Sequence, residues 1–476
     1  MMASRRGGLL VASNRLPVMV TRHADGTCRL APGGGGLVTA LAPVLRNRGG
    51  TWVGWPGTCD PGMPLDALLA EAGRQTGCRL EAVTLTEEDE RKFYQGFANE
   101  IIWPLFHDLH PLCNFDPSYW QVYQQVNRRY AALLAANAAE GDFVWVHDYH
   151  LMNVAQELRA LGMRGRIGFF LHIPFPPPDI FVKLPWRVQL LRALLSYDLI
   201  GFQALRDRRN FLDCVHHLIK KVGLRGRGRQ VLTLHTGERE VRVGSFPISI
   251  DFNGFVKRAA APQVSAKVAE LKRLLPDRQL ILGVDRLDYT KGIPHRLAAF
   301  RNALQRYPEL HERVTLVQVV VPSRELIPQY HDLKTQVERL VGEINGQFTR
   351  PGGWVPIHYV FRTLTRTDLL AYYRAAQIAL VTPLKDGMNL VAKEYCACSI
   401  EEDCTLILSE FAGAATELQG GALLVNPYDM EGVADAIYRA FVMPPDERRA
   451  RMRRLRRAVR RHDVFRWVDS FLRAAI

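Results

Sequence analysis

Residues 378–399 read IALVTPLKDGMNLVAKEYCACS, and the pattern changes from strand to helix within a few residues. The apolar run at 378–382 predicts a buried strand, and residues 390–399 carry apolar side chains at helical spacing. Pro, Lys, Asp, Gly and Asn between them are typical of a turn. A strand, a polar turn and a helix in this order form the unit of a parallel α/β sheet.

The same alternation recurs almost from end to end of the chain. Further strand patterns lie at residues 9–13, 143–146, 167–172, 199–202, 280–284, 314–321, 357–361 and 405–409. Helical patterns separate them, for example at residues 151–161, 184–195, 294–306 and 368–376. We therefore predict an α/β fold built around parallel sheets.

The strand patterns fall into two series separated by residues 230–246, which predict a hairpin turning at Thr236-Gly237. We place the domain boundary just after it. The predicted parts are a first α/β domain at 1–246, a second α/β domain at 247–445, and an Arg-rich helical segment at 446–476 that we expect to pack back on the first domain. Two such domains would leave a cleft between the carboxyl edges of their sheets, where open α/β folds bind ligands.

Composition excludes several classes of protein. The chain has 476 residues, of which 47% are hydrophobic and 23% charged, so it is neither a disordered chain nor a small scaffold that needs disulfides. No apolar run reaches the length of a membrane span, and we expect neither a signal peptide nor a membrane anchor. Eight cysteines without a repeated spacing predict reduced thiols and a cytoplasmic protein.

The net charge of +14 on its own would suggest an anionic partner. Most of the excess lies in one segment, because nine arginines fall between Arg448 and Arg461. Met452, Leu455 and Val459 recur there at helical spacing, which predicts a helix with one packed stripe and a solvated basic face. No aromatic residues alternate with the arginines, so we do not expect nucleic acid as a partner, and a basic tail that binds it is the alternative. A second basic patch at 220–229 indicates a surface loop.

Polar residues follow the predicted strands of the first domain. Arg15 comes after the first strand, and four glycines at 33–36 precede a helix, where backbone N–H groups could approach an anion. Asp148 comes after the strand pattern at 143–146 and His172 ends the pattern at 167–172; both are suited to binding sugar hydroxyls. His147 and His150 could bind a metal, but no acidic or cysteine cluster completes such a site, so we expect no metal.

In the second domain, the strand at 280–284 leads into Arg286 and Lys291. Two cations on one loop could hold a diphosphate. The alternative is a pair of surface ion pairs with Asp285 and Asp288.

The turn and helix start within residues 378–399 carry further groups that could bind a phosphate and sugar hydroxyls. Asn389 is a good helix N-cap, so the N–H groups of Leu390 and Val391 would face a phosphate. Glu394, one turn further along, could bind a ribose diol, and Asp386 could accept hydrogen bonds from sugar hydroxyls. An anion site beside acceptors for hydroxyl groups is what a nucleotide sugar requires, so these residues predict a nucleotide-sugar pocket.

Together these segments resemble the trehalose-6-phosphate synthases, retaining glycosyltransferases of the GT-B fold. The resemblance rests on Ser13-Asn14-Arg15, Gly35-Gly36-Leu37, Trp52 to Trp55, Phe93-Tyr94, Trp103-Pro104, Val146 to Leu151, Phe169 to Pro176, Arg286 to Gly292, Pro322-Ser323-Arg324, Thr382 to Tyr395, Leu408 to Ala415 and Val425 to Asp429. It implies two Rossmann-like α/β domains that face each other across a deep cleft. It also implies UDP-glucose as donor, glucose-6-phosphate as acceptor, and neither a metal nor a cofactor.

The resemblance also assigns roles to residues. The implied donor site comprises Gly35, Gly36, His172, Arg286, Lys291, Asp386, Gly387, Met388, Asn389, Leu390, Val391 and Glu394. The implied acceptor site comprises Arg15, Tyr94 and Arg324 around the phosphate and Trp55, Trp103 and Asp148 around the sugar. The implied catalytic residues are Asp148, His172, Arg286, Lys291 and Asp386.

The implied mechanism needs no metal, because Arg286, Lys291 and the helix N-terminus would stabilise the departing diphosphate. Front-face attack, with a donor phosphate oxygen taking the acceptor proton, would retain the anomeric configuration. Asp148 and Asp386 are the carboxylates to test as nucleophiles, although we favour hydroxyl binding for both.

The departures from the family pattern are the run of four glycines, Lys385 in place of arginine, and Ile293-Pro294-His295 in place of Leu-Pro-Glu. Several alternatives stay open: a glucosylglycerol-phosphate synthase, a pseudo-glycosyltransferase that joins cyclitols, a pyridoxal-phosphate phosphorylase of the same architecture, and a sugar-phosphate sensor without catalysis. The sequence also leaves open the donor base and the oligomeric state, a homo-oligomer included.

Overall fold

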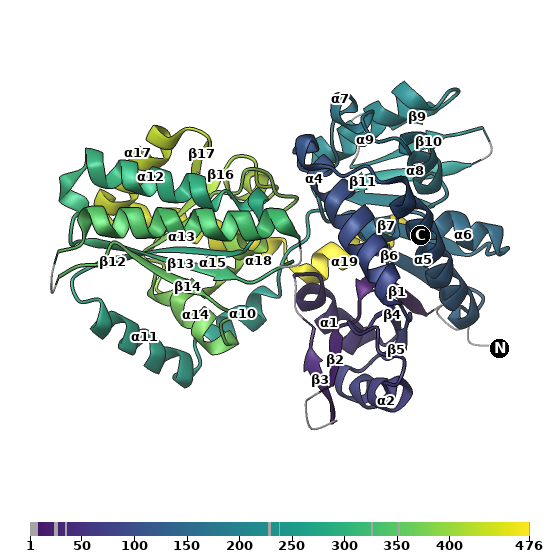
Figure 1. The fold of residues 1–476 in the computed structure, drawn as a ribbon, viewed down its shortest axis with the longest axis horizontal. Coiled ribbons are helices and arrows are strands. Elements are labelled where there is room, and N and C mark those ends of the chain that lie inside the picture. The colour runs from purple at the N-terminus through teal and green to yellow at the C-terminus, as the bar shows by residue number, and fades with distance from the viewer. Residues whose placement is uncertain are drawn as a thin grey trace. The chain divides into compact units, whose positions relative to one another are not determined.

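The structure is a computed structural model, and it describes residues 8–22, 27–33, 36–226, 230–237, 239–324, 327–350 and 353–475. The chain divides into two compact units (Figure 1). The first unit is Met1–Ile248 with Phe465–Ile476, and the second is Ser249–Val464. Each unit is described by itself below.

The first unit contains a nine-stranded sheet in the order β5-β4-β1-β6-β7-β8-β11-β10-β9. Its strands are β1 (Leu9–Arg15), β4 (Thr51–Trp55), β5 (Arg79–Ala82), β6 (Phe143–His147), β7 (Arg166–Phe170), β8 (Leu199–Phe202), β9 (Gly223–Arg225), β10 (Val231–His235) and β11 (Glu240–Ser245). The pairings from β5 to β11 are parallel, and β10 and β9 add to the edge antiparallel. A separate antiparallel hairpin joins β2 (Val18–Arg22) to β3 (Cys28–Pro32).

Helices connect the parallel strands of the first unit. They are α1 (Gly36–Arg48), α2 (Leu65–Thr76), α3 (Glu87–Asp89), η1 (Glu90–Ile102), α4 (Trp103–Phe106), η2 (His110–Leu112), α5 (Pro117–Asn137), η3 (Tyr149–Leu151), α6 (Val154–Ala160), α7 (Pro178–Phe181), α8 (Arg187–Leu194) and α9 (Leu205–Leu218). The longest, α5, begins at Pro117, and the carboxylate of its N-cap, Asp116, accepts the N–H of Ser118 at 2.8 Å. Both features favour a helix start there.

The second unit is built on a six-stranded, all-parallel sheet in the order β14-β13-β12-β15-β16-β17. Its strands are β12 (Gln279–Arg286), β13 (Val314–Val321), β14 (Ile357–Phe361), β15 (Ile378–Val381), β16 (Thr405–Ser409) and β17 (Leu423–Val425). Its helices are α10 (Phe252–Ala259), α11 (Pro262–Leu274), η4 (Tyr289–Lys291), α12 (Ile293–Arg306), η5 (Pro308–Leu310), α13 (Pro328–Phe348), α14 (Arg366–Ala375), α15 (Leu390–Cys398), α16 (Ala415–Leu418), α17 (Met430–Val442) and α18 (Pro445–Arg461). Figure 1 shows α12 and α17 on one side of this sheet and α11 and α14 on the other.

Burial explains why the central strands read as continuous apolar runs. Strand β13, Val-Thr-Leu-Val-Gln-Val-Val-Val, is buried along almost its whole length because helices cover both faces of the sheet. One core cluster joins residues of β12 and β13 to α12, α13 and α17. The predicted α/β fold with parallel sheets is therefore confirmed.

The predicted hairpin at 230–246 is present as β10 and β11, with Gly237 at a φ of +82° in the turn. Glycine suits this left-handed conformation because it has no Cβ. The second basic patch differs from the prediction, since Arg225 lies in the short edge strand β9 rather than in a loop. Residues 227–229 of that patch lie outside the described residues.

The C-terminal segment divides between the two units. Helix α18 has the predicted buried stripe of Met452, Leu455 and Val459, but it packs on α15 and α16 of the second unit. Helix α19 (Val464–Ala475) packs on the first unit, where the Phe471 ring stacks on Trp145 with a centroid distance of 4.6 Å. The prediction that the whole segment packs on the first unit is thus wrong for α18, whose stripe is buried in the second unit and whose Arg456 donates to carbonyls at the end of α15.

Among the residues that the structure describes, no helix has the length and apolarity needed to cross a membrane.

Candidate active site

Arg15 stands at the carboxyl end of β1 in the first unit. Its guanidinium lies over the Trp55 ring, 4.3 Å from the centroid, and 5.3 Å from the centroid of Tyr94. No carboxylate of the described residues lies within ion-pair distance of Arg15. Aromatic faces hold a cation without neutralising it, so Arg15 can bind an anion.

Tyr94 comes from η1, a run of π-helical turns that continues from α3 into α4. Its ring stacks on His150 at a centroid distance of 5.8 Å. The His150 ring lies 3.9 Å from that of Tyr149, which lies 5.7 Å from Trp103. This row of rings joins Arg15 and Trp55 to the loop of Asp148, so the structure brings together the five acceptor-site residues predicted in this unit.

Asp148 follows β6 with a φ of +75° and a ψ of 167°. This conformation is costly for a residue with a side chain, by about 1–3 kcal/mol, and such residues cluster at functional sites. Its Oδ1 accepts the backbone N–H of His172 at 3.2 Å, and its own N–H donates to the Phe170 carbonyl at 2.8 Å. The ends of β6 and β7 are thereby tied together.

His172 is held by two neighbours. Its Nε2 lies 3.1 Å from Nδ1 of His147, and its Nδ1 lies 3.3 Å from Nε2 of Gln203. Burial lowers the pKa of His172 to about 3 and also lowers that of His147 well below its usual value. Both rings are therefore neutral near pH 7. A contact between the His172 ring and a sugar hydroxyl would share or replace one of these hydrogen bonds.

In the second unit, the loops after β12 and β15 meet. The Lys291 Nζ lies 2.6 Å from Oδ2 of Asp386, and both side chains are largely buried. The Asp386 carboxylate also accepts the N–H of Met388 and the side-chain amide of Asn389, each at 3.3 Å. The two candidate loops therefore form one polar network.

Asp288 lies at the centre of a group of cations. Its Oδ2 is 3.7 Å from the Arg286 guanidinium and 3.6 Å from that of Arg324. Burial alone would raise the pKa of Asp288, but Arg324, Arg286 and Lys291 outweigh it and hold the pKa below its ordinary value. The alternative prediction of an ion pair between Arg286 and Asp288 is confirmed, but the pair is not wholly at the surface because Asp288 is buried. Asp285 pairs instead with Arg296, outside the predicted set.

Arg324 belongs to the second unit, where Nη1 donates to the Tyr330 hydroxyl at 2.6 Å and the side chain is 6% exposed. The structure thus places Arg324 beside the predicted diphosphate residues. That it joins Arg15 and Tyr94 around one phosphate stays a prediction.

Helix α15 begins as predicted. The Asn389 side chain accepts the N–H of Ala392 at 3.1 Å, which makes Asn389 the N-cap, and its φ is +80°. The N–H groups of Leu390 and Val391 have no hydrogen-bond acceptor among the described residues. Two N–H groups without acceptors in the first turn of a helix favour an anion, even though Asn389 satisfies the third.

Glu394 lies one turn into α15 and accepts the Tyr373 hydroxyl at 2.9 Å. Burial raises the pKa of this carboxyl above its ordinary value. The predicted ribose-binding residue is therefore a positioned hydrogen-bond acceptor in the unit that carries Lys291 and Asp386.

Tight backbone contact fixes the Asp386 loop. Gly413 N donates to the Asp386 carbonyl at 3.1 Å and Ala414 N to the Met388 carbonyl at 2.8 Å. A Cβ on Gly413 would overlap the carbonyl oxygen of Gly387. In the glycine loop of the first unit, Gly36 is the exposed first residue of α1, whereas Gly35 lies outside the described residues.

Sequence reasoning missed two supporting residues, Arg296 and Gln203. Arg296 is fully buried, and its Nε donates to Thr382 Oγ1 at 3.0 Å while Nη2 lies 3.4 Å from the Lys291 carbonyl. It therefore ties together the two loops of the second unit. Its position inside α12 gave no signal. Gln203, the partner of His172, could have been found, because it directly follows strand β8 as the other site residues follow theirs.

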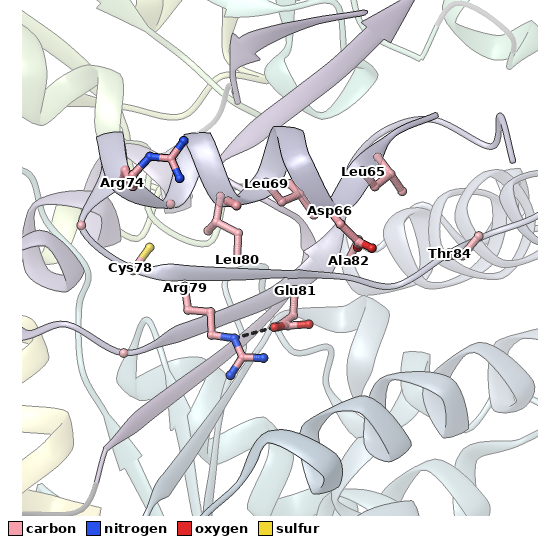
Figure 2. A pocket seen from close by; sticks show the side chains of 14 residues that line it. Leu65, Asp66, Leu69, Arg74, Cys78, Arg79, Leu80, Glu81, Ala82 and Thr84 are labelled. Atoms are coloured by element: carbon pink, nitrogen blue, oxygen red, sulfur yellow. Dashed lines mark ion pairs between the residues drawn. The ribbon is translucent and has the colours of Figure 1, made fainter. Parts of the chain in front are cut away.

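A pocket of about 730 Å³ lies elsewhere in the first unit, between α2 and the edge strand β5. Figure 2 shows Leu69 and Leu80 at this pocket, together with an ion pair between Arg79 and Glu81 of 2.7 Å. None of the predicted site residues lines it. We therefore assign it no part in the candidate site.

Comparison with known proteins decides the family. The sequence model of glycosyltransferase family 20 matches residues 7–475. The chain belongs to this family. A trehalose-6-phosphate synthase of Mycolicibacterium vanbaalenii is 45% identical over 484 residues, which cover 99% of this chain and 96% of the relative. A trehalose-6-phosphate synthase of Mycobacterium leprae is also 45% identical, covering 98% and 94% of the two chains.

Solved structures of the family agree over the whole chain. An α,α-trehalose-phosphate synthase (UDP-forming) from Burkholderia xenovorans, in complex with glucose-6-phosphate, has a TM-score of 0.88 and 36% identity, covering 99% of this chain and 100% of that one. A structure from E. coli bound with UDP-2-fluoro glucose has a TM-score of 0.86 and 36% identity, covering 98% and 99%. The family 20 chain has the predicted GT-B fold, with two Rossmann-like α/β units, and is a glycosyltransferase.

Proposed function

We propose that the chain is an α,α-trehalose-6-phosphate synthase, which transfers glucose from UDP-glucose to glucose-6-phosphate with retention of configuration. The observation that carries the proposal is the network of Lys291, Asp386 and Asn389 beside the open N-terminus of α15. It supplies a cation, amide donors and a hydroxyl acceptor within one unit. The curated relatives and the ligands of the solved relatives support the same reaction.

The second unit would hold the donor. Arg286, Lys291 and the N–H groups of Leu390 and Val391 would bind the diphosphate, because each donates to anionic oxygens. Glu394 would accept hydrogen bonds from the ribose. Asp386, Gly387, Met388 and Asn389 would surround the glucose, with Gly35, Gly36 and His172 contributed by the first unit.

The first unit would hold the acceptor. Arg15 and Tyr94 would bind its phosphate together with Arg324 of the second unit. Trp55, Trp103 and Asp148 would surround its sugar. An unneutralised guanidinium beside aromatic rings is suited to a phosphorylated sugar, because the rings can pack on its apolar face.

The chemistry follows from where charge develops. Negative charge builds on the leaving diphosphate, and Arg286, Lys291 and the α15 N-terminus would stabilise it; fixed donors of this kind contribute about 10²–10³-fold each in kcat. The acceptor hydroxyl would attack from the face of the departing diphosphate and give its proton to a donor phosphate oxygen. Asp148 and Asp386 would bind hydroxyls rather than act as nucleophiles.

The experiment compares UDP release from UDP-glucose with glucose-6-phosphate, with glycerol-3-phosphate and with no acceptor. We expect release that requires glucose-6-phosphate. Release with glycerol-3-phosphate instead would identify a glucosylglycerol-phosphate synthase. No acceptor-dependent release would indicate a sensor.

We also propose a cytoplasmic location. All eight cysteines are free, and burial raises the pKa of the Cys113 and Cys59 thiols to about 12, so they stay protonated. Unpaired thiols are typical of a reducing compartment.

A further inference from the structure

Gln203 is a buried side chain whose orientation can be assigned from its neighbours. Its Oε1 lies 2.9 Å from the backbone nitrogen of Ile248, and its Nε2 lies 3.3 Å from Nδ1 of His172. A backbone N–H only donates, so the atom facing Ile248 must be the amide oxygen. The amide nitrogen therefore faces His172 and donates to it.

This orientation assigns the proton on the His172 ring. Nδ1 accepts from Gln203 and so carries no hydrogen. In a neutral imidazole the hydrogen then sits on Nε2, which lies 3.1 Å from Nδ1 of His147. His172 donates to that atom, and the His147 hydrogen sits on its own Nε2, which is buried and without an acceptor in the described part of the chain.

We propose that Gln203 and His147 are positioning residues that hold His172 as the Nε2–H tautomer and fix its ring against β6 and β8. The ring has a partner at each nitrogen, and Trp467 of α19 packs beside both histidines, with centroid distances of 6.2 and 6.3 Å. The backbone N–H of His172 also donates to Asp148 Oδ1 at 3.2 Å. Fixing the ring thus also fixes the candidate carboxylate of the first unit.

The effect on turnover rests on the proposed function, whereas the tautomer does not. In metal sites, the outer hydrogen-bond partners of a functional histidine contribute about 10–100-fold. We expect a loss of about tenfold in kcat when either partner is removed, with KM for both substrates changed less than about twofold.

The first measurement is ¹⁵N NMR of the histidine ring nitrogens in the full-length protein labelled with ¹⁵N-histidine, assigned with single histidine variants. We expect His172 and His147 both to be protonated at Nε2 near pH 7. A hydrogen on Nδ1 of His172 overturns the proposal, whether or not the protein transfers glucose.

Variants then test the positioning role. His147→Phe removes the acceptor, whereas in His147→Asn the amide oxygen can take the place of Nδ1. Gln203→Glu replaces the donor by an acceptor and should move the hydrogen of His172 to Nδ1. We expect His147→Phe and Gln203→Glu to lose about tenfold in kcat and His147→Asn to recover most of that loss.

Wild-type kcat in both His147→Phe and Gln203→Glu would overturn the positioning role. Equal losses in His147→Phe and His147→Asn would overturn the part assigned to the His147 acceptor. An inactive wild-type enzyme with the expected ring spectrum would instead count against the proposed function.

Discussion

Charged residues of the candidate site have two kinds of partner. Some form ion pairs that neutralise their charge, and one lies against aromatic rings that leave its charge available. Lys291 and Asp386 form a close pair at 2.6 Å, and Asp288 is balanced by Arg286 and Arg324. Arg15 by contrast rests on two aromatic rings. The sequence predicted most of these side chains because they directly follow strands. It could not predict Arg296 as their support, since a buried arginine inside a helix resembles any exposed helical arginine in a sequence.

Lys291→Ala tests the proposed donor site. We expect kcat to fall by at least about 100-fold, because the variant removes a cation from the leaving diphosphate. Lys267→Ala is the matched control, since Lys267 also pairs with an aspartate, Asp368 at 2.8 Å, on helices outside the site. Steady-state UDP release should be unchanged in the control, and an active Lys291→Ala enzyme would contradict the assigned role.

The histidine pair predicts how stability depends on pH. His172 has a pKa lowered from 6.5 to about 3 by burial. Below pH 6.5 the unfolded chain therefore binds a proton that the folded chain does not, and the free energy of unfolding falls as pH falls. Between pH 7 and 5 we expect a loss of about 1–2 kcal/mol from this residue.

Urea denaturation at both pH values measures this loss. The fall in the free energy of unfolding between pH 7 and 5 should be smaller in His172→Asn, which lacks the titrating ring. An identical pH dependence in the variant and the wild type would show that burial of His172 does not set it.

At the scale of secondary-structure elements, close contact between backbone segments fixes the position of the candidate site residues. The loop after β16 donates two hydrogen bonds to the Asp386 loop, and Gly413 leaves no room for a side chain there. Strands β8, β13, β14 and β16 match their sequence predictions, and β8, β13 and β16 do so because buried parallel strands read as apolar runs. Strands β4, β5 and β17 were not among the predicted strands, and β5 and β17 lie at sheet edges. The hairpin of β2 and β3 was also not predicted.

Gly413→Ala should displace the Gly387 and Met388 backbone, because the added Cβ would overlap the Gly387 carbonyl. We expect UDP-glucose binding, measured by calorimetry, to weaken by at least about tenfold, or about 1.4 kcal/mol, because the displaced backbone belongs to the proposed donor site. Gly420→Ala is the control, since a Cβ there would meet no atom within 4 Å. Equal binding by the two variants would contradict the importance of this contact.

At the scale of the whole molecule, the chain leaves the first unit after Ile248 and returns to it at Phe465. The packing of the C-terminal segment was predicted only in part. The arginine-rich stretch predicts one segment at 446–476, whereas it forms two helices that pack on different units. Gly168 and Gly201 lie beneath the Phe471 ring of α19, where a Cβ would contact it at 3.0 and 2.7 Å. The first sheet is thus shaped to receive the C-terminal helix.

Phe471→Ala should destabilise the first unit by about 3–5 kcal/mol, the usual cost of removing a buried aromatic ring. Phe465→Ala on the same helix is the control, because its side chain is exposed. Thermal unfolding followed by near-ultraviolet circular dichroism should show a lower transition temperature for Phe471→Ala alone. Similar shifts in both variants would contradict the packing described for α19.

The most direct test of the central claim is to identify the product. The protein is incubated with UDP-glucose labelled with ¹³C in the glucose and with unlabelled glucose-6-phosphate, and the product is analysed by NMR. We predict α,α-trehalose-6-phosphate, with the label in the unphosphorylated ring and an α configuration at both anomeric carbons. Free labelled glucose, a β-linked product or a product without phosphate would contradict the account.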